Sequence, residues 1–314
     1  MDKKYKISGF LLNYNHAEFV AGALSDALNQ TVPFDEIVII DDASTDNSVE
    51  VIKSIVGNNP RVRIIKNEKN LGVIATLNRG VEEAKGDYVY ILSADDRYDT
   101  RIVEFCREAI DKFPGVAMIA GNAKVYVEEL KRTRVFKLPF PQVVVSYSRR
   151  DLEKMARKRA FTFLGGASLM RRDAILEAGN HLPELKWHAD WFLYLLVASK
   201  GGFVVVPEQF IEIRQTGGQY SAACFDWNQQ KHVIKDFIRI LKERYPNEYD
   251  FFSNNALLPT YDYQALLMII KDSDLRGYLT PLLAWRLLTY KPFRLLGKML
   301  SDEMRDKIRR FLRV

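Results

Sequence analysis

The sequence predicts an α/β fold with a mostly parallel central sheet and a helical C-terminal extension. Short apolar runs alternate with amphipathic helical patterns over the first 120 residues. Polar clusters follow several of these runs, and residues 228–245 and most of 261–314 have helical patterns. Strand–helix alternation with short loops is typical of a parallel sheet whose two faces are covered by helices.

The first half supplies five strands and four helices in strict alternation. Pro114 stops the fourth helix and Gly86 ends the third, as these residues do at helix ends. Because ligands of such sheets bind outside the carboxyl ends of the strands, the polar clusters there are candidate site residues. In chain order, strands are expected at 6–12, 36–40, 62–66, 88–92 and 116–120, and helices at 17–30, 46–56, 72–85 and 101–113.

Beyond residue 120 the pattern is mixed. Residues 123–127 and 134–138 are expected to pair as a hairpin, followed by a basic helix at 149–159. Extended segments at 165–172 and 203–214 flank an apolar helix at 190–200. The stretch YPNEYDFFSNN, residues 245–255, breaks the pattern, so a soft boundary is expected within 220–255.

Composition indicates a cytosolic enzyme. The chain has 314 residues, 47% hydrophobic and 27% charged, and no apolar run near the ~20 residues that span a bilayer. The N-terminus lacks a secretory signal, and two cysteines and four histidines match neither a disulfide framework nor a zinc motif. The net charge of +6 is concentrated in 131–159 and 286–313 without a nucleic-acid-binding motif, so nucleic acid is not expected as a partner.

Three carboxylates follow the strand at 88–92. Asp95, Asp96 and Asp99 in ILSADDRYD repel one another, which raises each pKa and favours a nearby cation. A hard divalent metal is one interpretation. The alternative is a solvated turn that caps the next helix, because Asp is common at both positions.

Together these segments resemble the family 2 glycosyltransferases with the GT-A fold. The resemblance runs from about residue 6 to 221 and is carried by LLNYNHAEFVAGALSDALNQT, IVIIDDASTDNSVEVI and NEKNLGVIATLNRGVEEAKGDYVYILSADD, in the family's order and spacing. It implies a Rossmann-like catalytic domain over 1–225, with a donor-nucleotide half at 1–120 and an acceptor half at 121–225. Residues 226–314 then form a helical C-terminal region.

The resemblance implies a nucleotide-sugar donor at the strand ends. Tyr14, next to Asn15, is placed to stack on the base. Asp41 and Asp42 are expected to bind base or ribose, with helix capping as the alternative. Further along the chain, the residues expected to bind the donor are Asn78, Arg79, Asp95 and Arg214, with Arg79 on a phosphate unless it is a solvated helix residue.

The acidic motif departs from the family at its first position. Members often read Asp-x-Asp there, whereas this chain has Ser93. Asp95 and Asp96 remain as ligands for Mg²⁺ or Mn²⁺, which would stabilise the departing diphosphate. Serine is a weaker, neutral ligand, which loosens the prediction of tight metal affinity.

The second half resembles the acceptor side of the family. In ELKWHADWFLYLL, Asp190 is the expected base that deprotonates the acceptor hydroxyl. Glu184 and His188 are the next choices, and a simple helix cap is the alternative for Asp190. Other acceptor-side candidates are Gly165, Gly166, Trp187, His188 and Trp191, while Gly217 and Gly218 suit a lid over the donor.

The chain is therefore expected to be a metal-dependent, inverting glycosyltransferase of bacterial cell-surface polysaccharide synthesis. It would use a nucleotide-sugar donor, with a UDP-sugar favoured, and a glycan or lipid-linked acceptor. A non-catalytic nucleotide- or glycan-binding relative is the alternative suggested by Ser93; a sugar nucleotidyltransferase fits less well. The basic, aromatic tail at 281–314 suits either contact with the inner face of the cytoplasmic membrane or packing on the catalytic domain or a homodimer partner.

Overall fold

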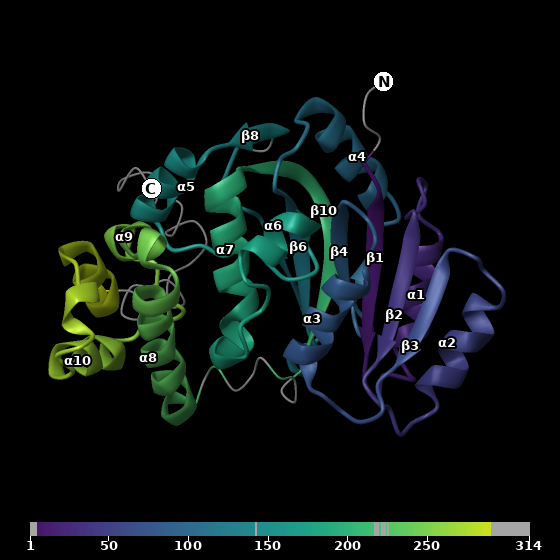
Figure 1. The fold of residues 1–314 in the computed structure, drawn as a ribbon, viewed down its shortest axis with the longest axis horizontal. Coiled ribbons are helices and arrows are strands. Elements are labelled where there is room, and N and C mark those ends of the chain that lie inside the picture. Colours follow the sequence, from purple (N-terminus) through teal and green to yellow (C-terminus); the bar gives the residue numbers. More distant parts are fainter. Residues whose placement is uncertain (1–4, 142, 217–219, 221–223, 225, 290–314) are drawn as a thin grey trace. The chain divides into compact units, whose positions relative to one another are not determined.

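Ten strands form one mixed sheet within the residues that the computed structural model describes, 5–141, 143–216, 220, 224 and 226–289 (Figure 1). The strands are β1 (Ile7–Asn13), β2 (Glu36–Asp41), β3 (Val62–Lys66), β4 (Tyr88–Ser93), β5 (Arg97–Tyr98), β6 (Met118–Val127), β7 (Arg132–Phe136), β8 (Val145–Tyr147), β9 (Ser168–Arg171) and β10 (Phe203–Gln215). Their order is β3-β2-β1-β4-β9-β6-β10-β5, with β7 beside β6 and β8 beside β10.

The long central strands are parallel, as the sequence predicts. β1 pairs in parallel with β2 and β4, β2 with β3, and β6 with β10. The expected hairpin of residues 123–127 and 134–138 is confirmed by the antiparallel β6–β7 pair. One feature was not anticipated: β9 enters the middle of the sheet antiparallel to both β4 and β6.

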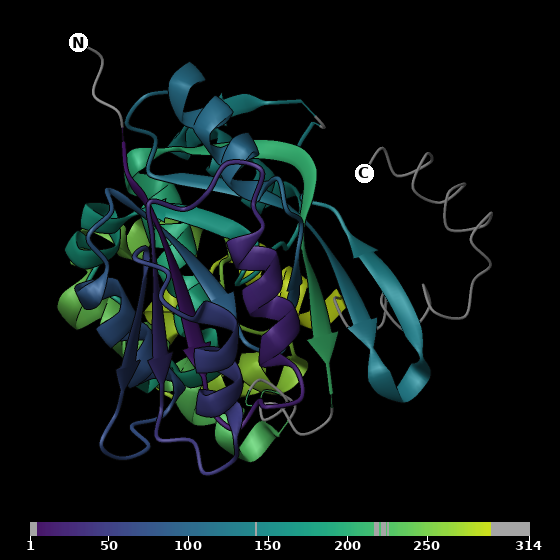
Figure 2. The same cartoon turned by 90° about the vertical axis from the view of Figure 1, so that its right-hand side faces the viewer.

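Helices cover both faces of the sheet (Figures 1 and 2). In β1, Leu11 belongs to the apolar cluster beneath α1 and α4, while its neighbour Phe10 packs against Gly80 of α3. Because successive strand residues point to opposite faces, α3 lies on the face opposite α1. The helices around the sheet are α1 (Val20–Leu28), α2 (Ser48–Val56), α3 (Val73–Glu83), α4 (Ile102–Lys112), α6 (Arg172–Glu177), the 3₁₀ turn η2 (Pro183–His188) and α7 (Ala189–Gly201).

The connectivity brings several segments to one edge of the sheet. The parallel strands β1, β2 and β4 all end there, so the loops after them lie side by side. β9 runs the opposite way, so the residues before it reach the same edge. α7 ends at Gly201, just before β10 starts at Phe203, so its first turn lies at the far, carboxyl end of that strand.

The chain forms two compact units, one of residues 1–149 with 162–222 and one of 150–161 with 223–314. The second unit is helical in the part that the structure describes, up to and including residues 281–289. Within 245–255 the helical pattern is interrupted at Tyr245, and a further helix follows: Pro246 occupies its first turn, where its missing N–H is not needed. The elements are α5 (Arg149–Lys158), α8 (Trp227–Arg244), α9 (Pro246–Asn254), α10 (Tyr263–Lys271) and η4 (Arg276–Tyr278).

Arg286 joins the two sequence segments of this second unit. Its buried guanidinium donates to the carbonyls of Asn255 at 3.0 Å and Ala256 at 3.2 Å, and to that of Ala156 in α5. These carbonyls lie at the ends of helices, where backbone acceptors lack intrahelical partners. Across the described residues, no helix combines the length and apolarity needed to cross a bilayer.

Candidate active site

The loop after β1 and the loop after β2 are held together by buried polar contacts. Asp41 is buried and accepts hydrogen bonds from Asn13 Nδ2 at 2.8 Å and from Ser44 N at 3.0 Å. Asn15 has a positive φ of 54° and its Oδ1 accepts from Thr45 N at 2.8 Å. Asp41 and Asn15 thus shape the loops, and their groups are engaged within the protein.

Tyr14 lies on the outside of this pair of loops. Its side chain is 40% exposed, unusually high for a large aromatic residue in the sheet unit. A ring that is anchored by rigid neighbours and open to solvent is suited to stacking on a planar ligand. This placement is compatible with the predicted base contact.

Asp42 organises the next loop along the sheet edge. Its carboxylate accepts from Asn67 Nδ2 at 2.6 Å and from the backbone N–H groups of Leu71, at 2.8 Å, and Gly72, at 2.9 Å. Gly72 directly precedes α3, so the capping alternative describes part of what this carboxylate does. Arg79 donates to Asn67 Oδ1, which completes a network from β2 to α3. Sequence reasoning gave no role to Asn67, although this residue opens the segment NEKNLGV that carries part of the family resemblance.

Asn78 holds a segment that is distant in sequence. Its Nδ2 donates to His181 O at 2.9 Å, and its Oδ1 accepts from His181 N at 3.0 Å. An amide that satisfies both backbone groups of one residue fixes that residue's position. Asn78 therefore ties α3 to the loop before η2.

The acidic motif lines a hollow of about 260 Å³ at the end of β4. Asp95, from the loop after β4, and Arg97, the first residue of β5, line it together with Glu18, Phe19 and Arg214. Carboxylates and guanidinium groups from three segments thus meet around one cavity. This arrangement is suited to an anionic ligand that carries its own cation.

Asp96 is buried beside this hollow. One of its oxygens accepts from Arg214 N at 2.9 Å. Burial and the neighbouring charge of Asp95 raise the pKa of Asp96 to about 8, although the Arg214 N–H works in the opposite direction. A divalent cation would relieve both effects, and carboxylate oxygens are the ligands that Mg²⁺ and Mn²⁺ prefer. The two carboxylates therefore fit a metal that takes its other ligands from substrate or water.

Arg214 is anchored from two sides. Its guanidinium donates to both carboxylate oxygens of Glu128 at 2.7 Å each and lies over the ring of Phe19, 4.0 Å from its centroid. Glu128 and Phe19 are partners that sequence analysis did not foresee, because they come from elements far apart in the chain. A fixed guanidinium at the rim of the hollow is suited to binding phosphate.

Asp190 lies in the first turn of α7, and Gly165 lies directly against it. A Cβ on Gly165 would come within 2.9 Å of Asp190 Oδ2. The Asp190 side chain is 42% exposed, and the partial burial of its carboxyl group raises its pKa. The structure therefore brings together two predicted acceptor-side residues, and the missing side chain at Gly165 leaves one carboxylate oxygen accessible.

Gly166 connects the acceptor-side loop to the acidic strand. Its carbonyl accepts from the buried Tyr90 hydroxyl of β4, and its positive φ of 71° favours glycine. A Cβ there would also clash with Ile211 of β10, at 2.5 Å. The loops that carry Asp95 and Gly165 are thus fixed on one scaffold.

An aromatic group lies near Asp190. Trp187 packs edge-on against Tyr220, with ring centroids 6.1 Å apart, and the ammonium of Lys186 lies 5.5 Å from the Trp187 centroid. The carboxylate of Asp190 contributes to the raised pKa of the Tyr220 hydroxyl, after burial. The half-buried indole of Trp187 and the exposed phenol ring of Tyr220 are suited to the apolar faces of sugar rings. His188 and Trp191 are half-buried on either side of Asp190 in sequence.

His181 is the site residue that the sequence did not reveal. Its imidazole is completely buried, and Nε2 lies 3.4 Å from Asp190 Oδ1. Burial lowers its pKa, although the Asp190 charge acts in the opposite direction. Since histidine carries no spacing signal here, only the fold could place it.

Two predictions fall partly or wholly outside the described residues. These are the lid at Gly217 and Gly218, and the tail from residue 290 onward. Among the described residues, no group of three His, Cys, Asp or Glu side chains could bind a metal ion by itself.

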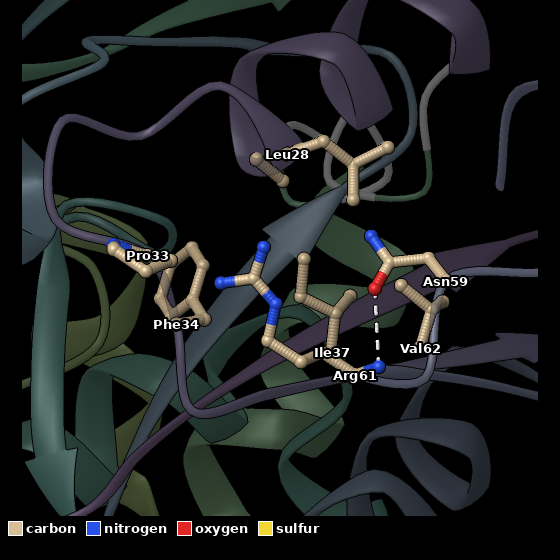
Figure 3. Close-up of a pocket in the computed structure, with 8 residues that line it drawn as sticks. Leu28, Pro33, Phe34, Ile37, Asn59, Arg61 and Val62 are labelled. Carbon is tan, nitrogen blue, oxygen red and sulfur yellow. Dashed lines mark hydrogen bonds between the residues drawn. The ribbon is translucent and has the colours of Figure 1, made fainter.

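A second hollow lies at the opposite, amino end of the sheet (Figure 3). Pro33, Phe34 and Ile37 line it with Asn59 and Arg61, where Asn59 Oδ1 accepts from Arg61 N at 3.1 Å. Its volume of about 10 Å³ holds roughly one water molecule. It is therefore too small to bind a nucleotide or sugar.

The fold is the GT-A glycosyltransferase fold. Residues 1–349 of TarS from S. aureus, solved with UDP-GlcNAc, match with a TM-score of 0.61 over 91% of this chain and 92% of that one, at 14% identity. A mannosyltransferase from Pyrobaculum calidifontis, solved with GDP-Man and Mn²⁺, matches with a TM-score of 0.56 over 95% and 84%, at 16% identity. At such low identities the likeness establishes the fold alone.

The chain belongs to glycosyl transferase family 2, whose family profile matches residues 10–179. It is 42% identical over 274 residues to a chondroitin synthase of Pasteurella multocida, covering 85% of this chain and 27% of that protein. It is also 42% identical over 100 residues to a hyaluronan synthase of Pasteurella multocida, covering 32% and 10%. The chain thus spans about a quarter or less of the length of these two polysaccharide synthases. The resemblance stated from the sequence is confirmed.

Proposed function

We propose that this chain is an inverting, metal-dependent glycosyltransferase that moves a sugar from a UDP-sugar onto a glycan or lipid-linked acceptor. The observation that carries the proposal is the placement of Asp190, a partly exposed carboxylate of raised pKa that lies against Gly165 at the same sheet edge as Asp95 and Asp96. A base and a phosphate-binding edge are the two requirements of a single displacement at an anomeric carbon.

The donor diphosphate would bind at the hollow after β4. Asp95 and Asp96 would hold Mg²⁺ or Mn²⁺, and Arg214, fixed by Glu128, would meet a phosphate oxygen. When bound, the cation supplies Lewis-acid stabilisation of the leaving diphosphate. Tyr14 would stack on the base at the neighbouring loop. Asp41, Asp42, Asn78 and Arg79 would act mainly by holding these loops in place.

The acceptor would lie between Gly165 and the aromatic group of Trp187. Asp190 takes the proton from the acceptor hydroxyl as that oxygen attacks the anomeric carbon, and the bond to the diphosphate breaks with its electron pair on the leaving group. His188 and Trp191 would complete the acceptor side. The relatedness to chondroitin and hyaluronan synthases supports bacterial surface polysaccharide as the product class.

The setting we propose is the inner face of the cytoplasmic membrane. In the described part of the tail, Trp285 is 62% exposed and Leu288 is 56% exposed, next to basic residues. Exposed aromatic and aliphatic side chains beside lysine and arginine favour a membrane interface. The alternative to test is that the same helix packs against a second copy of the chain in a homodimer.

Calorimetric titration and a transfer assay test the proposal together. UDP and GDP are each titrated with Mn²⁺ or with EDTA, and transfer from UDP-sugars to glycan acceptors is followed by nucleotide release and product mass. We expect one nucleotide to bind only with metal, and Asp95→Ala to abolish that binding. Asp190→Asn should keep nucleotide binding and lose about 10²–10⁴-fold in transfer.

The outcomes separate the two candidate functions. Metal-independent nucleotide binding without turnover or donor hydrolysis would support the non-catalytic binding relative that Ser93 suggests. Full transfer by Asp190→Asn would refute the assignment of the base. Glu184→Gln tests the next choice for the base in the same segment: it should leave the transfer rate within a factor of two if Asp190 is the base, and a loss as large as that of Asp190→Asn would count against Asp190.

A further inference from the structure

His181 is held by four hydrogen-bond contacts with two asparagines, and its remaining ring nitrogen faces Asp190. Asn78 fixes its backbone on both sides, as described above. Asn180 Oδ1 lies 3.1 Å from Nδ1 and 3.0 Å from the His181 backbone N–H. Nε2 is buried and has no hydrogen-bond partner within the described residues, and Asp190 Oδ1 lies 3.4 Å away. A buried nitrogen in this condition calls for a functional or structural reason.

The contacts around the ring determine its tautomer. Asn180 Oδ1 accepts from the His181 backbone N–H, which identifies that atom as the amide oxygen. An oxygen can only accept, so Nδ1 carries the proton of the neutral ring. Nε2 therefore presents a lone pair to Asp190. Burial lowers the pKa of His181, so the imidazole is neutral at neutral pH and its Nε2 faces Asp190 without a proton.

We propose that His181 is a positioning residue that makes Asp190 a stronger base by accepting a hydrogen bond from it once Asp190 holds the acceptor's proton. This inference rests on the proposed function. In the resting state an ionised Asp190 gains nothing from the lone pair of Nε2. When the acceptor O–H bond breaks and the proton moves to Asp190, the new carboxyl O–H can donate to Nε2.

The interaction is therefore formed as the reaction proceeds and is absent at its start. An interaction that is stronger in the transition state than in the ground state raises kcat, whereas uniform binding affects KM. It also leaves Oδ2, the oxygen beside Gly165, open to the acceptor. After transfer, Asp190 releases the proton to solvent through its exposed side.

Other titratable groups near Asp190 do not compete for this role. Tyr194, on the same helix, and Tyr220 both feel the Asp190 charge, and both have hydroxyl pKa values raised chiefly by burial. Both are therefore neutral around pH 7. His188, although adjacent in sequence, is half-buried and packs beside Trp187.

The test compares His181→Leu, which keeps an apolar side chain of similar length, with His181→Gln, which keeps an acceptor oxygen. We expect His181→Leu to lower kcat 10–100-fold with an unchanged donor KM, and to move the acidic limb of the kcat–pH profile to lower pH. His181→Gln should recover at least half of the lost kcat, on a logarithmic scale. His232→Gln, an exposed histidine of the second unit, is the control and should match wild type.

A wild-type kcat and pH profile in His181→Leu would overturn the proposal while leaving Asp190 as the base. If His181→Leu does not fold, His181→Gln decides: a rate near that of Asp190→Asn overturns the proposal. Full activity in Asp190→Asn would instead refute the proposed function itself. Imidazole ¹⁵N spectra, assigned with His181→Gln, give a readout without turnover. We expect the Nδ1–H tautomer at pH 7, and an Nε2–H tautomer or an imidazolium would overturn the inference.

Discussion

Carboxylates at one sheet edge behave differently because their neighbours differ. Both Asp41 and Asp42 receive several hydrogen bonds from backbone or amide donors and act as structural ties. Asp96 is also buried, but among the described residues its carboxylate accepts a hydrogen bond only from Arg214 N, and it lies beside the negative charge of Asp95. A carboxylate with too few donors is costly to ionise in the interior. This imbalance is what a bound cation would correct.

We predict that Asp96→Asn stabilises the protein in EDTA at pH 8 but not at pH 4. The pKa of Asp96 is about 8 in the folded state, against an ordinary value of 3.8 for aspartate in the unfolded chain, so the unfolded chain ionises first as pH rises. Folding stability of the wild type therefore falls between pH 4 and 8, and Asn removes this loss while still accepting from Arg214 N. The gain should reach about 2–5 kcal/mol by linkage. Urea unfolding at both pH values measures it.

A pH-independent difference would contradict this explanation. In excess Mn²⁺ at pH 8 the wild type should become more stable to urea than Asp96→Asn, because the cation stabilises only a protein that can bind it. Asp99→Asn is the control: this exposed neighbour accepts from Arg101 N at 2.8 Å, so its replacement should show no comparable gain between pH 4 and pH 8.

At the scale of elements, close backbone packing positions the loops. Gly80 of α3 lies directly on the ring of Phe10 in β1, and a Cβ there would come within 2.1 Å of Phe10 Cζ. Phe10 is completely buried, so its ring has nowhere to move. The position of α3 in turn sets Asn78 and Arg79 at the site edge.

We predict that Gly80→Ala destabilises the protein by about 1–3 kcal/mol through overpacking. Alanine would favour the helix by ~1 kcal/mol over glycine, so a net loss isolates the steric effect. Urea unfolding compares it with Glu82→Ala, an exposed position on the same helix, which should stay within about 0.5 kcal/mol. Equal or greater stability of Gly80→Ala would show that α3 can shift away from β1.

The sequence predicted elements that form through local pattern and missed those that form through distant pairing. β1 to β4 and their helices have continuous apolar runs or helical spacing, which are local signals. The short strand β5 and the antiparallel direction of β9 depend on partners that are far away in the chain. Likewise Asp190 and Gly165 were predicted from a resemblance to a family, but their contact, and the role of His181, required coordinates.

At the scale of the molecule, the chain enters the second compact unit twice. Residues 150–161 belong to it, then the chain returns to the sheet and re-enters the unit at residue 223. The boundary proposed at residue 225 lies close to this second entry. Within the unit, Arg286 bonds carbonyls of both segments, at Ala156 and at Asn255 and Ala256. Because these carbonyls are buried, removing the Arg286 side chain would leave them without a hydrogen-bond donor.

We predict that Arg286→Leu lowers the free energy of unfolding by about 3 kcal/mol, because three buried carbonyls lose their donor. Thermal unfolding should show the loss, with nucleotide binding at the sheet unit unchanged at low temperature. Arg239→Leu is the control, since Arg239 lies exposed on α8 and pairs with Asp236 only at 3.7 Å. An equal loss of unfolding free energy in Arg286→Leu and Arg239→Leu would contradict the stabilising role of the buried Arg286 contacts.

The reversed direction of β9 has an evolutionary consequence. A purely parallel sheet offers its carboxyl edge only the loops that follow strands, so every change to the site alters a crossover connection. Here the edge is also supplied by residues that precede a strand, in a separate stretch of the chain near Gly165. If the donor and the acceptor bind as proposed, their preferences can diversify independently among descendants. Donor preference would change through the loops after β1, β2 and β4, and acceptor preference through the residues before β9.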